Sequence, residues 1–269
     1  MKLLYLSSLV SGLAACGAPL TGSPQAKVDT LQAQSWFTGR PKSLRALTAT
    51  IDGLERRYRR SNDARAFFAT TYLITTRNII RAMDLGVFAD RPRMERMTLA
   101  FGNLWLDALE AQDGGRRDAA PPAWRLAFGA GLEPSVSPAR VLMLSINAHV
   151  IRDLPFAVAA TATPDAALEP DFKSLNRILG DEVPEVRQAL VSRYGNWSRD
   201  LVERWDDRLP GLAMGAARDL SWRLAVQLHR DPVAGPEVIE ERALASGKLV
   251  DRPVLLDAVW AWMRWTTKA

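Results

Sequence analysis

The chain has 269 residues, of which 48% are hydrophobic and 24% are charged, and its formal net charge is +5 at pH 7. These are ordinary values for a globular protein, and they exclude a fibrous or wholly disordered chain. The positive charge is spread along the sequence, which contains no zinc-finger pattern, RNP motif or long basic run. We therefore expect no nucleic-acid partner, whereas a spread positive charge suits a position near anionic lipid headgroups.

The first 16 residues have the pattern of an export signal. Lys2 gives a positive start, and residues 3–15 are apolar or small but too few to span a bilayer. The ending LAAC at residues 13–16 resembles the lipobox of bacterial lipoproteins, in which the signal is removed before a cysteine that carries the lipid. Cys16 is the only cysteine, so an internal disulfide is excluded. The alternative is an ordinary signal peptide with a chance cysteine.

A tether is expected to follow the signal, because residues 17–42 are punctuated by glycine and proline. The sequence therefore predicts a lipoprotein signal peptide over residues 1–16, a flexible tether over 17–42 and a folded domain over 43–269. The lipid on Cys16 would anchor that domain in the cell envelope, on the non-cytoplasmic (periplasmic) side of a bacterial membrane, with the membrane as its first partner.

Apolar residues at steps of three and four predict amphipathic helices beyond the tether. The first begins after the cap candidate Ser43, and the second starts at Asp63 and stops at Gly86. The third has Asp90 as its N-cap, and a short helix follows Pro121-Pro122.

The second half of the chain continues the helical pattern. We expect a helix over residues 138–153, a short one over 171–180, and a long one from Pro184 with Gly195 inside it. Helices over 211–230 and 253–265 close the chain. Paired alternating runs and repeats are missing from the sequence. The prediction is a single all-α bundle of about eight to ten helices with a central buried helix.

The helix over 138–153 carries the most unusual polar pair in the sequence. Apolar residues cover nearly all of its sides, which is typical of a helix in the middle of a bundle. His149, one of only two histidines, is four residues before Asp153, so the two side chains project within about 40° of each other. Pro155 is expected to end or bend the helix and open a pocket beside Asp153.

The pair allows three interpretations. It can be a structural hydrogen bond or ion pair that fixes the bundle, two ligands of a metal ion, or a metal-free acid–base dyad. Asn147 projects to the opposite side, where we expect it to bond a neighbouring backbone or side chain.

A larger pattern resembles an uncharacterised bacterial family, a domain of unknown function, whose hallmark is Asn-Ala-His-x-x-x-Asp-Leu. The segments that carry the resemblance are FADRPRMERMTLAFGNLWLDAL, PPAWRLAF, INAHVIRDLP, DFKSLNRIL and DLSWRLAVQL. The hallmark positions here are Asn147, His149, Asp153 and Leu154. Asp90, Asp171 and Asn176 match further polar positions. The resemblance implies one coherent domain focused on His149 and Asp153, and it implies no reaction.

A second, local resemblance covers AHVIRDLP alone. It is similar to the His-x-x-x-Asp helix of the zinc-dependent phospholipase C and P1 nuclease family, in which that histidine and aspartate hold zinc. Only His149 and Asp153 carry over, because the chain has one further histidine, His229. A site with several imidazole ligands is thus excluded, which leaves a carboxylate-rich site in which Asp90 or Asp171 completes the shell.

Two functions are therefore expected as alternatives. In the first, a divalent metal ion held by His149, Asp153, Asp90 and Asp171 acidifies a water that hydrolyses a phosphoester or lipid-like substrate, with His149 and Asp153 as the catalytic pair. In the second, the chain is a non-catalytic binding or scaffold lipoprotein. There His149–Asp153 is a structural polar pair, and a core pocket takes a small-molecule or lipid ligand.

Overall fold

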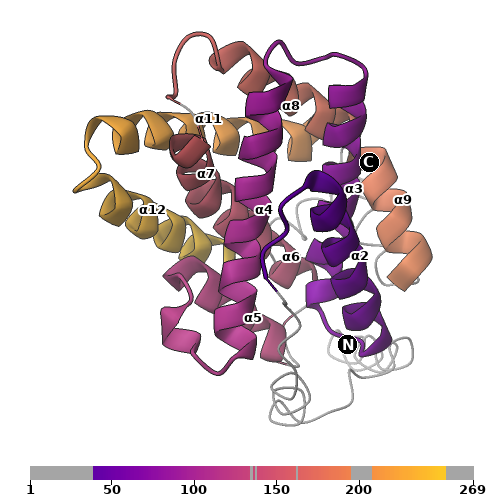
Figure 1. Cartoon of the computed structure of the whole chain (residues 1–269). Coiled ribbons are helices and arrows are strands. Elements are labelled where there is room, and N and C mark those ends of the chain that lie inside the picture. The colour runs from indigo at the N-terminus through magenta and orange to yellow at the C-terminus, as the bar shows by residue number, and fades with distance from the viewer. Residues whose placement is uncertain (1–38, 134–135, 137, 162, 195–207, 253–269) are drawn as a thin grey trace, which may run out of the picture.

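The computed structural model describes residues 39–133, 136, 138–161, 163–194 and 208–252 (Figure 1). In these ranges the regular elements are all helical, which confirms the predicted all-α class. They are α2 (Leu44–Arg60), α3 (Arg65–Asp84), α4 (Arg91–Asp113), η1 (Arg117–Ala119), α5 (Pro122–Leu132), α6 (Pro138–Asn147), η2 (Ala148–Asp153), α7 (Leu154–Thr161), α8 (Glu169–Asp181), α9 (Val183–Tyr194), α11 (Arg208–Arg230) and α12 (Gly235–Val250). The predicted signal peptide with Cys16, most of the predicted tether, Gly195 and the helix expected over 253–265 lie outside the described residues.

Local signals set the ends of the first helices as expected. The Ser43 hydroxyl accepts the backbone N–H of Ala46 at the start of α2, and the Asp90 carboxylate accepts that of Arg93 at the start of α4. Gly86 follows α3 with φ of 69°, the left-handed conformation that ends a helix and suits glycine. These termini need no information from distant parts of the chain.

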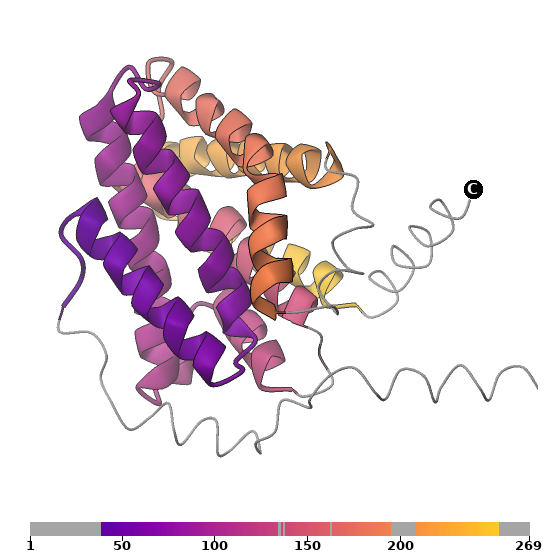
Figure 2. The same ribbon diagram turned by 90° about the vertical axis from the view of Figure 1, so that its right-hand side faces the viewer.

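The central helix lies between two groups of helices, one made of α2, α3 and α4 and the other of α11 and α12. Helices α2, α3 and α4 lie side by side, and α11 crosses them at a steep angle in both views (Figures 1 and 2). The segment from α6 to α7 contacts α3 and α4 on one side and α11 and α12 on the other. This position places residues 138–161 at the centre of the core.

The central helix is long and apolar enough to cross a membrane by composition. However, 72% of its most apolar window is buried inside the fold, as in the core helix of a globular domain. The expected central buried helix is therefore observed.

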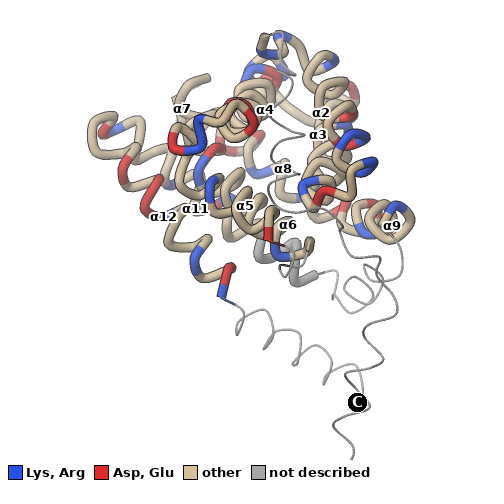
Figure 3. Tube along the Cα trace, turned by 90° about the horizontal axis from the view of Figure 1, so that it is seen from below, with Lys and Arg blue, Asp and Glu red and all other residues tan. Residues whose placement is uncertain are grey.

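On the outside of the domain, basic and acidic residues are interspersed along the helices (Figure 3).

Of the two outcomes expected at Pro155, an end or a bend of the helix, the end is not observed. Residues 148–153 instead form a π-helix, in which the Leu154 N–H donates to the His149 carbonyl, and α7 then continues to Thr161. In an α-helix the Pro155 ring would collide with the carbonyl four residues earlier. The wider π turn relieves that collision, so the proline stays within the helix.

A neighbouring helix satisfies the backbone group that Pro155 leaves unpaired. In the π register the Val150 carbonyl would accept from residue 155, which has no N–H. The Ser221 hydroxyl of α11 donates to that carbonyl over 2.6 Å and is itself completely buried. The π-helix is therefore stabilised by tertiary contact as well as by its own sequence.

Helix α12 was not predicted from the sequence. Its buried residues include Gly235, Ile239, Ala243 and Gly247, most of them too small to give a strong apolar stripe. A Cβ added to Gly247 would lie 3.1 Å from the amide nitrogen of Asn147, so this helix is packed closely against the central one. Small residues at a close helix contact leave little hydrophobic signal in a sequence.

Candidate functional site

The structure brings His149 and Asp153 together on the π-helix. The His149 Nδ1 atom lies 3.1 Å from Asp153 Oδ2, and the side chains are 4% and 0% exposed. Both residues belong to the widened turn, and such turns are frequent at functional sites. The predicted adjacency is therefore observed, in a place shielded from water.

Asp153 is held by three donors from three side chains. Trp124 of α5 donates its indole N–H to Oδ2 over 2.8 Å, in addition to the His149 contact. Arg152 donates to Oδ1 over 2.9 Å and also to Glu240 of α12 over 2.8 Å. These bonds occupy both carboxylate oxygens, so Asp153 is a paired, rigid group.

Asp153 determines which nitrogen of His149 carries the proton. A carboxylate can only accept, so the Nδ1 atom is the donor and the Nε2 atom is left with a lone pair. Burial lowers the pKa of His149 more than the hydrogen bond to Asp153 raises it. The lowered pKa keeps the ring neutral. Nε2 is buried, and no hydrogen-bond partner reaches it among the described residues. His149 therefore presents an unused acceptor.

Aromatic rings hold the imidazole in place. The ring stacks on Phe101 with centroids 3.5 Å apart, and Tyr72 and Phe68 contact it edge-on at 4.5 and 5.5 Å. Rotation about the side-chain bonds would break these contacts and the bond to Asp153. The direction of Nε2 is thus fixed by packing.

His149 lines a cavity of about 160 Å³ that is partly open to solvent. Its walls come from α3, α4, α8, α9, α11 and the central helix, and they are mostly apolar, as with Met97, Phe101 and Leu154. A cavity of this size, lined in this way, holds a small organic molecule such as benzene in other proteins. Asp153 is not among the lining residues, so the pocket does not open beside it as Pro155 had suggested.

Two buried residues with acidic or basic side chains, Glu182 and Arg218, also line the cavity. Glu182 is 6% exposed and accepts hydrogen bonds from Thr75 and Asn78 of α3. Burial raises the pKa of Glu182 to about 7, despite those hydrogen bonds. Arg218 is 4% exposed, and burial lowers its pKa to about 10, against the charges of Asp219 and Glu182. Arg218 therefore stays charged at neutral pH.

Asp90 and Asp171 lie together, away from the imidazole. Asp171 is buried, and its two carboxylate oxygens accept the backbone N–H groups of Ala89 and Asp90, each over 2.9 Å. Asp90 is exposed and caps α4. The described ranges contain no group of three or more His, Cys, Asp or Glu side chains that could hold a metal ion. Both aspartates instead organise the start of α4.

Asn147 points to the opposite side of the central helix, as expected. Its amide donates to the Ala243 carbonyl over 2.8 Å, and its oxygen accepts from Ser246 over 2.6 Å. These bonds attach the central helix to α12. Asn147 thus fixes the helix from behind while His149 faces the cavity.

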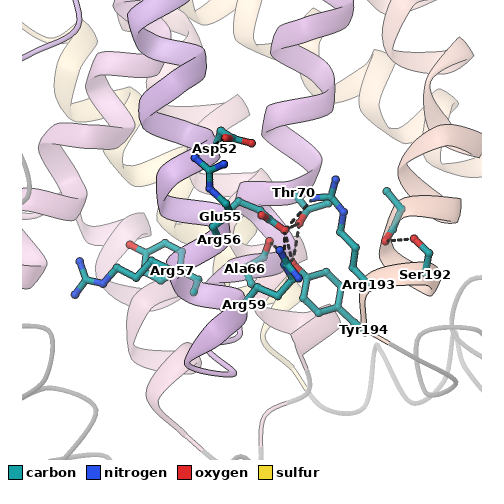
Figure 4. Close-up of polar contacts among 12 residues, drawn as sticks. Asp52, Glu55, Arg56, Arg57, Arg59, Ala66, Thr70, Ser192, Arg193 and Tyr194 are labelled. Carbon is teal, nitrogen blue, oxygen red and sulfur yellow. Dashed lines mark hydrogen bonds and ion pairs between the residues drawn. The ribbon is translucent and has the colours of Figure 1, made fainter.

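A second buried carboxylate, outside the cavity, is fully paired. Glu55 of α2 accepts from Arg193 over 2.9 Å, from Thr70 over 3.3 Å and from Tyr194 over 3.5 Å, and it forms an ion pair with Arg59 (Figure 4). Tyr194 also stacks on Phe67. We call Glu55, Arg59, Thr70, Arg193 and Tyr194 the Glu55 cluster; it attaches the end of α9 to α2 and α3.

The sequence matches the family described as "Family of unknown function (DUF5995)" over residues 44–252. The chain belongs to this family. Comparison with curated proteins and with solved structures found no match. The family range spans all the described helices, and it includes the π-helix and the cavity. Membership therefore supports one coherent domain and assigns no reaction.

Sequence reasoning missed four residues of the site in this DUF5995 domain. Trp124 and Arg152 complete the environment of Asp153, and Glu182 and Arg218 line the cavity. Arg152 had a signal, since it directly precedes Asp153 in the HVIRD segment. Trp124 lies in the PPAWRLAF segment that carries the family resemblance, but nothing in the sequence connects it to Asp153. Glu182 and Arg218 carry no signal, because each lies far from His149 in sequence.

Proposed function

We propose that this domain binds a small, mostly apolar molecule in the cavity and that His149 supplies the polar contact. The observation that carries the proposal is the buried, unpartnered Nε2 atom of His149 on an apolar wall. A buried acceptor without a partner costs about 1–3 kcal/mol of stability, so a ligand that donates a hydrogen bond to it gains selectivity. This is the binding alternative expected from the sequence, with a chemical preference added.

Two matched ligands test the proposal. Toluene and p-cresol differ only by a hydroxyl group, and both suit a cavity of about 160 Å³. We expect p-cresol to bind the full-length chain about fivefold more tightly than toluene in calorimetry, since one hydrogen bond contributes about 1 kcal/mol. His149→Phe should abolish the difference while both ligands still bind. His229→Phe is the matched control, because His229 is exposed at the end of α11.

Two results would contradict the proposal. If neither toluene nor p-cresol binds, the proposed binding function is contradicted. Equal affinities of the unaltered chain for toluene and p-cresol would remove the role of Nε2. Displacement of both ligands by His149→Trp, which fills the cavity, would support the location independently.

The geometry also favours acid–base catalysis as a second candidate. A carboxylate that fixes a neutral imidazole, with the other nitrogen directed at a bound molecule, is the arrangement of a general base. The activity test is hydrolysis of 4-nitrophenyl acetate, an ester built on one substituted aromatic ring. A rate above background that disappears in His149→Phe and survives a chelator would support this dyad.

Metal-assisted hydrolysis has less support from the contacts. His149 Nδ1 and both oxygens of Asp153 are engaged in hydrogen bonds, and Asp90 and Asp171 are engaged elsewhere. An activity lost on adding a chelator and restored by a divalent ion would nevertheless favour it over the metal-free dyad.

We further propose that the domain is anchored in the cell envelope through a lipid on Cys16. The support is the export-signal pattern and the single cysteine. Cys16→Ser should move the protein from the membrane fraction to the soluble fraction of expressing bacteria. Unchanged fractionation would contradict the anchor and leave the cavity proposal untouched.

A further inference from the structure

Arg218 is buried, and the two acidic groups that act on it, Asp219 and Glu182, form no ion pair with it among the described residues. The Nε–H of Arg218 donates to the Asn176 side chain over 2.7 Å and one terminal nitrogen donates to the Phe172 carbonyl over 3.4 Å. No ion pair to Arg218 is found in the part of the chain that the structure describes. A guanidinium has five N–H donors, and in Arg218 the described residues supply acceptors to two of its three nitrogens. Burying a charge without a counter-ion is costly.

The position of Arg218 makes an anion the natural partner. The residue lies on α11, its guanidinium stacks over the Phe172 ring at 4.5 Å, and it lines the cavity with His149. Stacking and the Asn176 bond hold the planar fork in one orientation. A planar guanidinium group held in one orientation is suited to bidentate binding of a carboxylate.

We propose that Arg218 is the anion-binding residue of the cavity and that the natural ligand is an apolar carboxylic acid of about the size of one substituted aromatic ring, bound to Arg218 as the carboxylate and carrying a separate hydrogen-bond donor, such as a ring hydroxyl, for His149. The inference rests on the proposed binding function and adds the class of ligand. A singly charged carboxylate matches one guanidinium, whereas a doubly charged phosphate would need more positive charge and would face Glu182 in the same cavity.

The structural alternative is that Arg218 only joins α11 to α8. It would then act through Asn176 and Phe172, and removing either contact would have the same consequence as removing the charge. Asn176 does not line the cavity, so the two roles can be separated by substitution.

The experiment compares three ligands on one scaffold by calorimetry with the full-length chain: 4-methylbenzoate, its neutral isostere 4-methylbenzamide, and 4-methylphenyl phosphate. Titrations are made at pH 6, where the raised pKa of Glu182 keeps that carboxyl largely protonated. The other ionisable groups that act on Glu182 are Glu185 and Arg218. We expect the benzoate to bind at least about tenfold more tightly than the amide.

Variants assign the effect to the charge. Arg218→Met should make the benzoate bind no better than the amide, and Arg218→Lys should retain part of the preference. Asn176→Ala should lower stability yet keep most of the preference, because stacking on Phe172 still orients the guanidinium. Arg223→Met, an exposed arginine on the same helix, should behave as the unaltered chain.

Each failure has a distinct meaning. If benzoate and amide bind equally, the carboxylate proposal is overturned while the cavity function stands. Tighter binding of the phosphate overturns the assignment to carboxylic acids. Loss of the preference in Asn176→Ala as well as in Arg218→Met supports the purely structural role. If none of the three ligands, toluene or p-cresol binds, the underlying binding function fails.

Discussion

The Glu55 cluster and the cavity both contain buried ionisable side chains, but they differ in how completely those side chains are paired. Glu55 is 2% exposed and accepts from neighbours on α2, α3 and α9. His149 and Arg218 are similarly buried, yet Nε2 has no hydrogen-bond partner and the guanidinium forms no ion pair among the described residues. Paired groups stabilise a fold, whereas buried groups left unpaired are available to a ligand.

The His149–Asp153 pair contains both a fully paired and an incompletely paired buried group. Asp153 is as fully paired as Glu55, and it holds an imidazole that is paired on one side only. The comparison therefore predicts that Asp153 and Glu55 contribute mostly to stability and His149 mostly to binding. Four substitutions sharpen or break this distinction.

Asp153→Asn should have the largest effect, lowering the free energy of unfolding by about 4 kcal/mol. It replaces an acceptor by a partial donor opposite three N–H groups, and it leaves Arg152 with Glu240 alone. Urea denaturation followed by circular dichroism measures the loss. Asp118→Asn, at an exposed position, is the control. A change below 1 kcal/mol would mean that the pair is not structurally important.

Glu55→Gln should follow, with a loss of about 3 kcal/mol, because the arginines and Tyr194 lose their common acceptor charge. Unlike changes at the cavity, it should leave p-cresol affinity unchanged. The same denaturation experiment on Glu241→Gln, an exposed glutamate, gives the baseline. A weakened affinity for p-cresol in Glu55→Gln would break the distinction between the two regions.

Glu182→Gln should stabilise the protein at high pH. The folded pKa of about 7 lies above the ordinary value of 4.5, so the folded state holds a proton that the unfolded state releases. Stability from this group is thus present below pH 4.5 and is lost as pH rises to about 7. Removing the carboxyl should raise the free energy of unfolding at pH 8 by about 3 kcal/mol, with little change at pH 4.5. An equal effect at both pH values would disprove the raised pKa.

His149→Phe should have the smallest effect on stability, at most about 1 kcal/mol near neutral pH, since Phe keeps the stacking and Asp153 keeps two donors. Burial lowers the pKa of His149, so the unfolded state binds the proton more readily and stability falls as pH drops below 6.5. The variant should lose that acid-side decline. A loss of several kcal/mol at pH 7 would make His149 a structural residue like Glu55.

The sequence was sufficient for the features that depend on neighbours along the chain. Ser43, Asp90 and Gly86 mark helix ends through local hydrogen bonds and backbone angles. The four-residue spacing of His149 and Asp153 places them on one side of a helix whatever surrounds it. The buried character of that helix follows from its apolar composition on all sides.

Only the tertiary structure decided what the imidazole faces. Pro155 stays inside the helix because the turn widens and Ser221 of a distant helix satisfies the freed carbonyl. Arg218 and Glu182 reach the cavity from other helices, and α12 packs through small residues that leave no apolar stripe. Helix periodicity is set by bonds between residues close in sequence, whereas a cavity is set by how several helices fill space. The first can be predicted from the order of residues alone, and the second requires their packing.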